Sequence, residues 1–196
     1  MANPEGCKKV AGGRQTTGNC TARPRTPDGC QICCVEELAF RHPRSTLACM
    51  GSTFYSLHYH WVCSTKERRP LIRAPWSPSF HEYLGGTIRG LDGVPLKIGG
   101  VEDHVHALIG LQAVHAISDF VRELKKATSV WASEQHEREF QWQEGYSIFS
   151  VSASMVPVVS KYIEGQPEHH RKHSFADELK ALLEKHGVKY DPKYLV

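Results

Sequence analysis

Between residues 53 and 187 the sequence alternates between the period of a β-strand and that of an α-helix, and this order of segments constrains the fold most. Stretches rich in aromatic and β-branched residues with alternating polarity predict strands. Stretches with apolar residues three or four positions apart predict helices. We expect strands over 53–65, 94–102, 104–112 and 146–154, and helices over 77–91, 115–137, 156–170 and 175–187.

The order strand, helix, strand, strand, helix, strand predicts an α+β fold. It is typical of a ferredoxin-like βαββαβ split sheet, here with additional C-terminal helices. Little more than Glu102 and Asp103 separates the second and third strands, so we expect an antiparallel hairpin there. Gly187 is a candidate stop for the last helix. We expect helices on one face of the sheet, and the opposite face left for a partner or a ligand.

Residues 1–49 differ in composition from the rest of the chain. They are rich in Gly, Pro, Thr, Arg and Cys and show no sustained apolar period, which predicts a disordered or loosely organised extension. A single domain over 50–196 follows. Met50 directly precedes the regular pattern and is an alternative translation start.

Six of the seven cysteines lie in residues 1–49, where no apolar stretch resembles a secretory signal. A disulfide scaffold is therefore not expected. The sequence CQIC has the spacing of half a zinc site, but no second spaced pair completes it. The candidate zinc ligands would be Cys30, Cys33, Cys7 and Cys20.

The net charge of +3 lies in the extension, because residues 1–49 carry seven Lys/Arg and four Asp/Glu while residues 50–196 carry 17 of each. Overall charge therefore does not indicate a nucleic-acid-binding protein. No run of 18 or more uncharged apolar residues is present, so we expect no membrane partner. We expect a cytoplasmic protein.

The octapeptide DHVHALIG places His104 and His106 two positions apart in a predicted strand. Both imidazoles would then project from the same face. With an oxygen donor they could bind a divalent metal, although a histidine pair alone is more often structural. Asp103 is a candidate direct ligand or outer partner, or only a turn residue. His58 and His60 form a rival pair, which we interpret as structural or as lining a DNA-facing surface.

A second stretch, KYIEGQPEHH, contains Tyr162 and Gln166 four residues apart, on one face of a predicted helix. Their phenol and amide oxygens could approach the histidine pair together. Tyrosine can act as a covalent nucleophile when a metal polarises the electrophile. Its ordinary pKa of about 10 means that it needs such help at neutral pH. On spacing alone, a core tyrosine and a polar residue at a helix end remain alternatives.

Five separated stretches together resemble the single-tyrosine HUH transposases of small insertion sequences, which include the REP-associated tyrosine transposases. The stretches are YHWVCSTKERRPLI, EDHVHALIGL, FQWQEGYSIFSVS, KYIEGQPEHH and SFADEL…LLEKHGVKYDPKYL. The resemblance runs from about residue 52 to residue 196, in the order found in the family. The first 50 residues are the departure, since the family does not need them.

The resemblance implies that His104 and His106 bind Mg²⁺ or Mn²⁺, with Gln166 as third ligand and Tyr162 as nucleophile. It implies cleavage of single-stranded DNA at hairpin-flanked ends, through a 5′-phosphotyrosine and a free 3′-OH that later rejoins strands. It also implies a homodimer with merged sheets, in which the tyrosine helix can complete the partner's site. Such a protein would be associated with the nucleoid when bound to DNA.

Several basic residues are candidate phosphate contacts, although such residues are often only solvated surface. They are Lys66, Arg68, Arg69, Arg122, Lys125, Lys126, His169, His170, Arg171 and Lys172. Among the aromatic residues that could stack on bases, we expect Trp61 and Tyr146 in the core and Trp142 exposed.

Two other functions remain open from the sequence. A domesticated relative would bind hairpin DNA without transposing it. A small metallohydrolase would use the histidines with Asp103 and would make no protein–DNA adduct.

Overall fold

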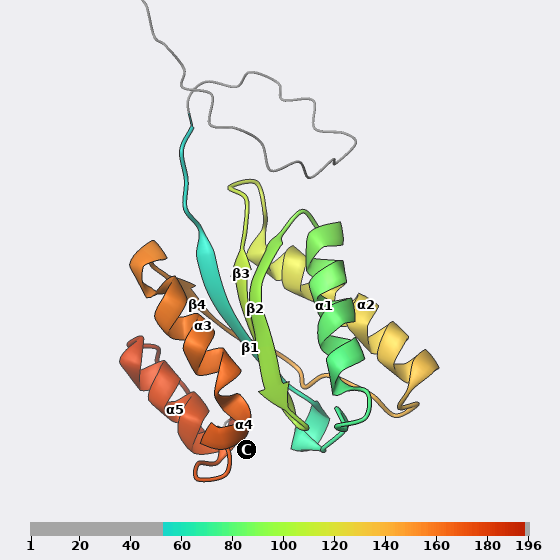
Figure 1. The fold of residues 1–196 in the computed structure, drawn as a ribbon. Helices are drawn as coiled ribbons and strands as arrows, with labels where there is room; N and C mark the ends of the chain where they lie inside the picture. Colours follow the sequence, from blue (N-terminus) through green and yellow to red (C-terminus); the bar gives the residue numbers. More distant parts are fainter. Residues whose placement is uncertain (1–52, 195–196) are drawn as a thin grey trace, which may run out of the picture. The chain divides into compact units, whose positions relative to one another are not determined.

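A four-stranded antiparallel sheet is the centre of the structure, a computed structural model that describes residues 53–194 (Figure 1). The strands lie in the order β2-β3-β1-β4. Their bounds are His58–Ser64 for β1, Val94–Val101 for β2, His104–Gly110 for β3 and Ser147–Val151 for β4. The hairpin of β2 and β3 and the predicted α+β split sheet are both confirmed.

Five α-helices and three short 3₁₀ turns complete the described part of the chain. The helices are α1 (Ser77–Gly90), α2 (Ile117–Gln135), α3 (Val156–Glu164), α4 (Gln166–His169) and α5 (Phe175–Lys185). The 3₁₀ turns are η1 (Lys66–Arg68), η2 (Ala153–Met155) and η3 (Pro192–Tyr194).

Two predicted boundaries differ from the structure. The first strand begins at His58, where its pairing with β3 and β4 starts, instead of at residue 53. The single helix expected over 156–170 is interrupted at Gly165, which caps the end of α3. Pro167 contributes to this break, since it has no N–H to continue the helical hydrogen bonds.

Helices α1 and α2 pack on one face of the sheet and enclose the main hydrophobic core (Figure 1). Trp61 belongs to this core, as predicted, and is fully buried. The prediction for Trp142 was wrong: it is buried, and its Nε1 donates to Thr128 Oγ1 at 3.0 Å. A bridge to Thr65 draws this irregular segment inward. Tyr146, expected in the core, is instead 39% exposed.

The opposite face of the sheet is covered by α3, α4 and α5 of the same chain (Figure 1). The expectation that helices lie on one face and leave the other open was therefore wrong. Helix α5 is amphipathic and buries its apolar side chains Phe175 and Leu183 against Val62 and Phe149. Burial of that apolar stripe accounts for the covered face. We call the two sides the α1–α2 face and the α3–α5 face.

Glycines allow two features of the α3–α5 face. A Cβ on Gly99 of β2 would lie 2.6 Å from the carbonyl oxygen of Ile163, so only glycine lets α3 lie this close to the sheet. Gly187 ends α5 with a φ of 64°, as predicted, and Val188 N–H donates to Leu183 O at 2.9 Å. This is the bonding pattern of a left-handed helix end.

The expectations for residues 1–49, including the zinc ligands and the alternative start at Met50, lie outside the described residues. Within residues 53–194 no helix is long and apolar enough to cross a lipid bilayer.

Candidate metal and nucleophile site

The histidine pair of β3 lies on the α3–α5 face. Val105 and Ala107 alternate with it and enter the core under α1 and α2. Both His104 and His106 are fully buried, and β3 is paired on both sides. Their rings meet edge to face with centroids 5.1 Å apart. A central strand thus holds two imidazoles side by side, as the spacing predicts.

The tyrosine and glutamine converge on this pair from the two helices that flank Gly165. Gln166, at the start of α4, is fully buried, and its Oε1 lies 3.4 Å from His104 Nε2. The ring of Tyr162, near the end of α3, stands 6.0 Å from the His106 ring in an edge-on arrangement. The break between the helices therefore keeps both side chains at the same cluster.

Sequence reasoning missed Glu178 of α5, which joins all of these groups. Its Oε1 accepts a hydrogen bond from the hydroxyl of Tyr162 and one of 2.8 Å from Gln166 Nε2. Its Oε2 lies 3.0 Å from His170 Nε2 and 3.4 Å from His106 Nε2. One signal was readable in the sequence: Glu178 falls three residues after Phe175, on the apolar side of an amphipathic helix.

Burial and mutual contacts shift the pKa values of these groups. Burial acts to raise the pKa of Glu178, but the neighbouring His106, Tyr162 and Gln166 outweigh it and hold the pKa far below its usual range. Burial, together with Glu178, raises the pKa of the Tyr162 phenol. Burial also lowers the pKa of His106. The cluster thus combines a carboxylate, a protonated phenol and a neutral imidazole.

Each histidine of the pair makes a hydrogen bond through its Nδ1 atom. His104 Nδ1 lies 2.7 Å from Asp103 Oδ1, and His106 Nδ1 lies 2.9 Å from His60 Nε2. Burial and the neighbouring His106 lower the pKa of His60 to about 3, so that ring is neutral. Such partners fix the orientation of a metal-binding imidazole. Asp103 therefore contacts His104 on the side away from Glu178, and His60 contacts His106, whereas His58 contacts Ser56.

The donor atoms suit a divalent metal. One ligand atom from each of His104, His106, His170 and Glu178 lies within 4.8 Å of the others. The Nε2 atom of His106 is buried and has no hydrogen-bond partner, which is unusual for a buried polar atom. Imidazole nitrogens and a carboxylate are common ligands of divalent ions. The residues present therefore fit a metal at this cluster.

An open pocket of about 590 Å³ leads to the edge of the cluster. Asp103 and His170 line it, and so do Arg68, Arg171 and His173. Three candidate phosphate contacts, Arg68, His170 and Arg171, thus lie beside the histidine cluster. Arg171 also pairs with Glu168 at 2.8 Å.

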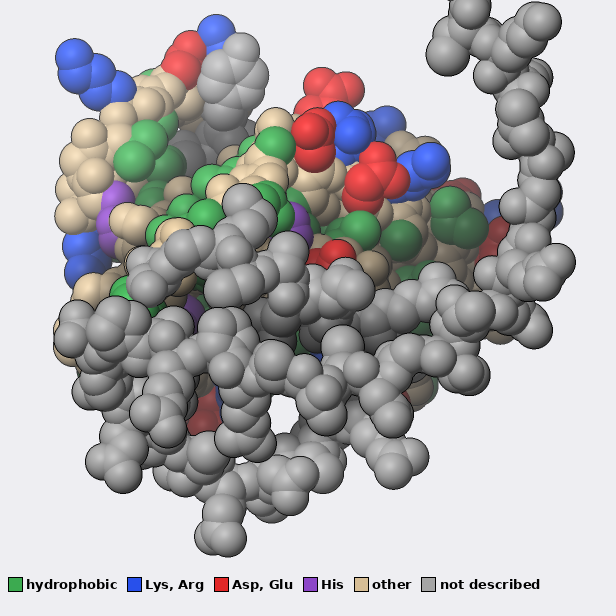
Figure 2. Space-filling model, turned by 90° about the horizontal axis from the view of Figure 1, so that it is seen from above, with side chains coloured by type: hydrophobic (Ala, Val, Ile, Leu, Met, Phe, Trp, Pro, Cys, Tyr) green, Lys and Arg blue, Asp and Glu red, His purple; other side chains and the backbone are tan. Residues whose placement is uncertain are grey.

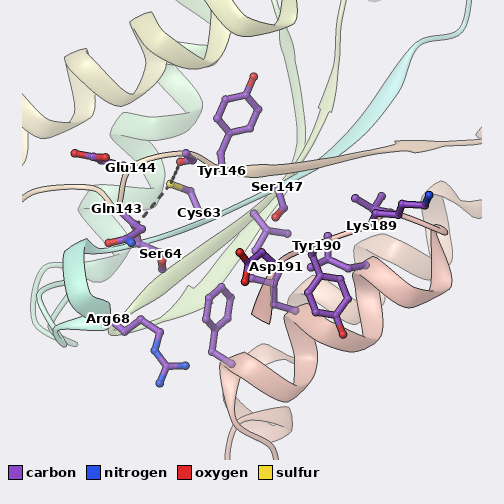
Figure 3. Close-up of a pocket in the computed structure, with 16 residues that line it drawn as sticks. Cys63, Ser64, Arg68, Gln143, Glu144, Tyr146, Ser147, Lys189, Tyr190 and Asp191 are labelled. Carbon is purple, nitrogen blue, oxygen red and sulfur yellow. Dashed lines mark hydrogen bonds between the residues drawn. The ribbon is translucent and has the colours of Figure 1, made fainter. Parts of the chain in front are cut away.

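A second pocket, of about 630 Å³, lies between the sheet and α5 (Figure 3). Arg68 stands at one end and Lys189 at the other, with Tyr190 and Asp191 between them (Figure 3). Phe175 lines both pockets and stacks on His104 with ring centroids 4.3 Å apart. The two hollows therefore meet at Arg68 and Phe175.

Other basic candidates lie apart from the cluster or are already paired. On α2, across the sheet, Arg122 pairs with Asp119 and Glu123, and Lys125 donates to the carbonyls of Gln143 and Gly145. Figure 2, a view from above, shows Lys and Arg side chains beside Asp and Glu on the part of the surface that is coloured. The remaining candidates are Lys126 on α2, Lys66 beside Gln141, Arg69 paired with Glu139, His169 near Glu178, and Lys172 after α4.

The chain is similar in sequence to known transposases. The sequence profile of the family described as "Transposase IS200 like" matches residues 53–166. The ISDra2 transposase TnpA of Deinococcus radiodurans is 28% identical over 121 residues, which cover 57% of this chain and 85% of that protein.

One solved structure has the same fold, and a second was also matched. A crystal structure from Deinococcus radiodurans R1, described as a transposase, has a TM-score of 0.50 at 23% identity and covers 60% of this chain and 95% of that chain. A REP-associated tyrosine transposase bound to a REP hairpin has a TM-score of 0.47 at 14% identity, covering 62% and 74%.

A split sheet with paired histidines and a tyrosine on a following helix defines a DNA transposase of the single-tyrosine class. The profile match spans more than half of the chain, and the chain belongs to the IS200-like transposase family.

Proposed function

We propose that this transposase cuts and rejoins single-stranded DNA at hairpin-flanked ends through a phosphotyrosine at Tyr162. One observation carries the proposal: the hydroxyl of Tyr162 and the buried pair His104 and His106 meet the same side chain, Glu178. A nucleophile and a metal-binding pair within one cluster suit metal-assisted cleavage of a phosphodiester by tyrosine.

The chain's own residues prepare the nucleophile. Glu178 holds the Tyr162 hydroxyl among the imidazoles, and the raised pKa of the phenol means that it enters the reaction protonated. In the reaction the phenol gives up its proton, for which the Glu178 carboxylate is the nearest acceptor, and its oxygen bonds to phosphorus. The bond from phosphorus to the 3′ oxygen breaks, and that oxygen takes up a proton. A Mg²⁺ or Mn²⁺ ion held by His104, His106 and Gln166 would offset the charge that develops on the phosphate oxygens.

The substrate reaches this cluster from the open pocket beside His170. Because His104 and His106 are fully buried, a phosphate contacts them only after part of the cover from α4 and α5 moves aside. Arg68 and Arg171 at the pocket attract the backbone phosphates and position the strand there.

The proposal is tested by the variant Tyr162→Phe, which removes only the attacking oxygen. Incubated with hairpin-bearing single strands and Mn²⁺, the wild-type protein should give a covalent protein–DNA band on a denaturing gel, and the variant should give none. Hairpin binding should survive. The matched control is Tyr83→Phe, on α1 across the sheet, which should form the adduct normally. Adduct formation by Tyr162→Phe would overturn the nucleophile assignment.

The proposal includes a homodimer. Both β2 and β4 are edge strands in the order β2-β3-β1-β4, so each leaves one edge without a strand partner in the described part of the chain. A second copy can extend the sheet across such an edge. Light scattering during size-exclusion chromatography should give twice the mass of the chain, and a monomer at micromolar concentration would contradict this.

A further inference from the structure

We infer that His170 and Glu178 are themselves metal ligands, and that together with His104 and His106 they form a four-residue site that selects a transition-metal dication over Mg²⁺. The inference rests on the proposed metal role of the β3 histidines. It adds two metal ligands, one on α4 and one on α5, that the sequence patterns did not predict to bind metal. It also favours transition-metal ions over Mg²⁺.

The separations of the donor atoms support four ligands. Around Glu178 Oε2, the Nε2 atoms of His170, His106 and His104 lie at 3.0, 3.4 and 3.7 Å. Donor atoms bound about 2.1 Å from a tetrahedral dication lie about 3.4 Å from one another. The four atoms are thus spaced as ligands of one ion.

The hydrogen bonds behind the rings point their Nε2 atoms inward. Nδ1 of His104 faces the carboxylate of Asp103 at 2.7 Å, and Nδ1 of His170 faces the backbone carbonyl of His173 at 3.0 Å. Carboxylate and carbonyl oxygens only accept, so Nδ1 of each ring donates, and Nε2 is the atom that faces Glu178. A partner at Nδ1 of this kind is the usual support of a metal-binding histidine.

The buried carboxylate of Glu178 needs a positive partner. Glu178 is only 5% exposed, and within residues 53–194 its polar contacts are histidines, Tyr162 and Gln166. A buried carboxylate is unfavourable without a compensating positive charge. A dication bound among the four donor atoms would supply that charge.

The donor set also determines which ion is preferred. Mg²⁺ favours oxygen ligands and retains several waters, whereas imidazole nitrogens favour transition metals. Three imidazoles and one carboxylate are therefore a poor site for Mg²⁺ and a good one for Mn²⁺ and later transition ions. The amide oxygen of Gln166, 3.0 Å from His170 Nε2, lies beside this set and is available as a fifth ligand.

In the test, Mn²⁺ is titrated into the full chain without DNA. Calorimetry measures the affinity for the ion, and electron spin echo spectroscopy detects the nitrogen atoms bound to it. Wild-type protein should bind Mn²⁺ at least about 10-fold more tightly than Mg²⁺, with nitrogen couplings from three imidazoles. Glu178→Gln and His170→Ala should each weaken Mn²⁺ binding at least about 10-fold. His170→Ala should leave couplings from two imidazoles. The matched controls, Glu168→Gln on α4 and His115→Ala before α2, should bind as the wild type does.

Thermal unfolding in EDTA checks that each variant is folded, and two independent variants keep the test decisive if one is not. Unchanged Mn²⁺ affinity in a folded Glu178→Gln or His170→Ala protein overturns the four-ligand site, as does a wild type that binds Mg²⁺ as tightly as Mn²⁺. His104→Ala separates the two proposals. If it retains Mn²⁺ binding, the proposed metal centre itself fails. If it loses binding while Glu178→Gln and His170→Ala do not, only the additional ligands fail.

Discussion

The two faces of the sheet use the same strands for different purposes. On the α1–α2 face, two long helices of 14 and 19 residues enclose aromatic and aliphatic side chains. On the α3–α5 face, three shorter helices enclose buried histidines, Gln166 and Glu178. Val105 and His106 are neighbours in β3, yet one lies in an apolar core and the other in a polar cluster.

The comparison teaches that the α1–α2 face holds most of the apolar core, while the α3–α5 face holds the polar cluster of the proposed site. Apolar contacts on the α1–α2 face supply stability through burial. The polar groups on the α3–α5 face are buried together at a cost that their mutual hydrogen bonds offset, and that the proposed cation would offset further. Substitutions on the two faces should therefore differ in which property they change.

The largest effect on stability should come from Phe80→Ala on the α1–α2 face. Phe80 is fully buried and packs edge-on against Trp76 and close to Trp142. Removing the ring should lower the free energy of unfolding by about 3–5 kcal/mol. Chemical denaturation with tryptophan fluorescence measures this. A loss below about 1 kcal/mol would contradict the division between the faces.

A smaller loss of stability, coupled to activity, should follow from Gly99→Ala. The new methyl group would meet the Ile163 carbonyl oxygen and push α3, which carries Tyr162, away from β2. We expect a loss of about 1–3 kcal/mol and a clear drop in adduct formation. Gly86→Ala on α1, where a Cβ meets nothing within 4 Å, is the control and should lose neither. Normal adduct formation by Gly99→Ala would show that the position of α3 is not critical.

The substitution Thr128→Val should affect stability alone. It removes the oxygen that accepts from Trp142 Nε1 and leaves that donor buried without its partner. The expected loss is about 1–2 kcal/mol, seen as a lower melting temperature. Adduct formation per folded molecule should be unchanged, and a fall in it would mean that the α1–α2 face also contributes to the chemistry.

The smallest effect should come from Arg68→Gln, at the junction of the two pockets. Loss of one phosphate contact should weaken binding of single-stranded DNA a few-fold and reduce the slope of log K against log salt by about 0.7. Arg122→Gln should bind DNA as the wild type does. Arg122 lies on α2, on the face of the sheet opposite the cluster, and pairs there with Asp119. Fluorescence anisotropy measures the DNA affinity of both variants. Equal losses of affinity would show that DNA does not bind at the pocket beside Arg68.

Much of the fold could be predicted because periodicity reports local structure. The hairpin around Glu102 and Asp103 and the ends of α1 and α5 follow from apolar spacing and turn residues. The burial of Trp142 did not follow, because it depends on a bridge to Thr65, 77 positions earlier in the chain. Sequence spacing carries no information about such a distant pairing.

The site was predicted in part for the same reason. His104 and His106 share a strand, and Tyr162 and Gln166 are four residues apart, so their proximity is a local property. Glu178 joins them only because α5 packs on the same face of the sheet, and in the sequence FADELKALLEK a glutamate looks like any solvent-exposed helix residue. Its place between Phe175 and Leu182 on the apolar side was the available clue.

The central claim is that Tyr162 attacks DNA within the α3–α5 face. Its most direct test is mass spectrometry of the covalent adduct formed with Mn²⁺ and hairpin-bearing single strands, after digestion with nuclease and trypsin. Cleavage after Lys161 and Arg171 releases the peptide YIEGQPEHHR, in which Tyr162 is the only tyrosine. The account predicts a nucleotide mass on this peptide, and an adduct on any other peptide would contradict it.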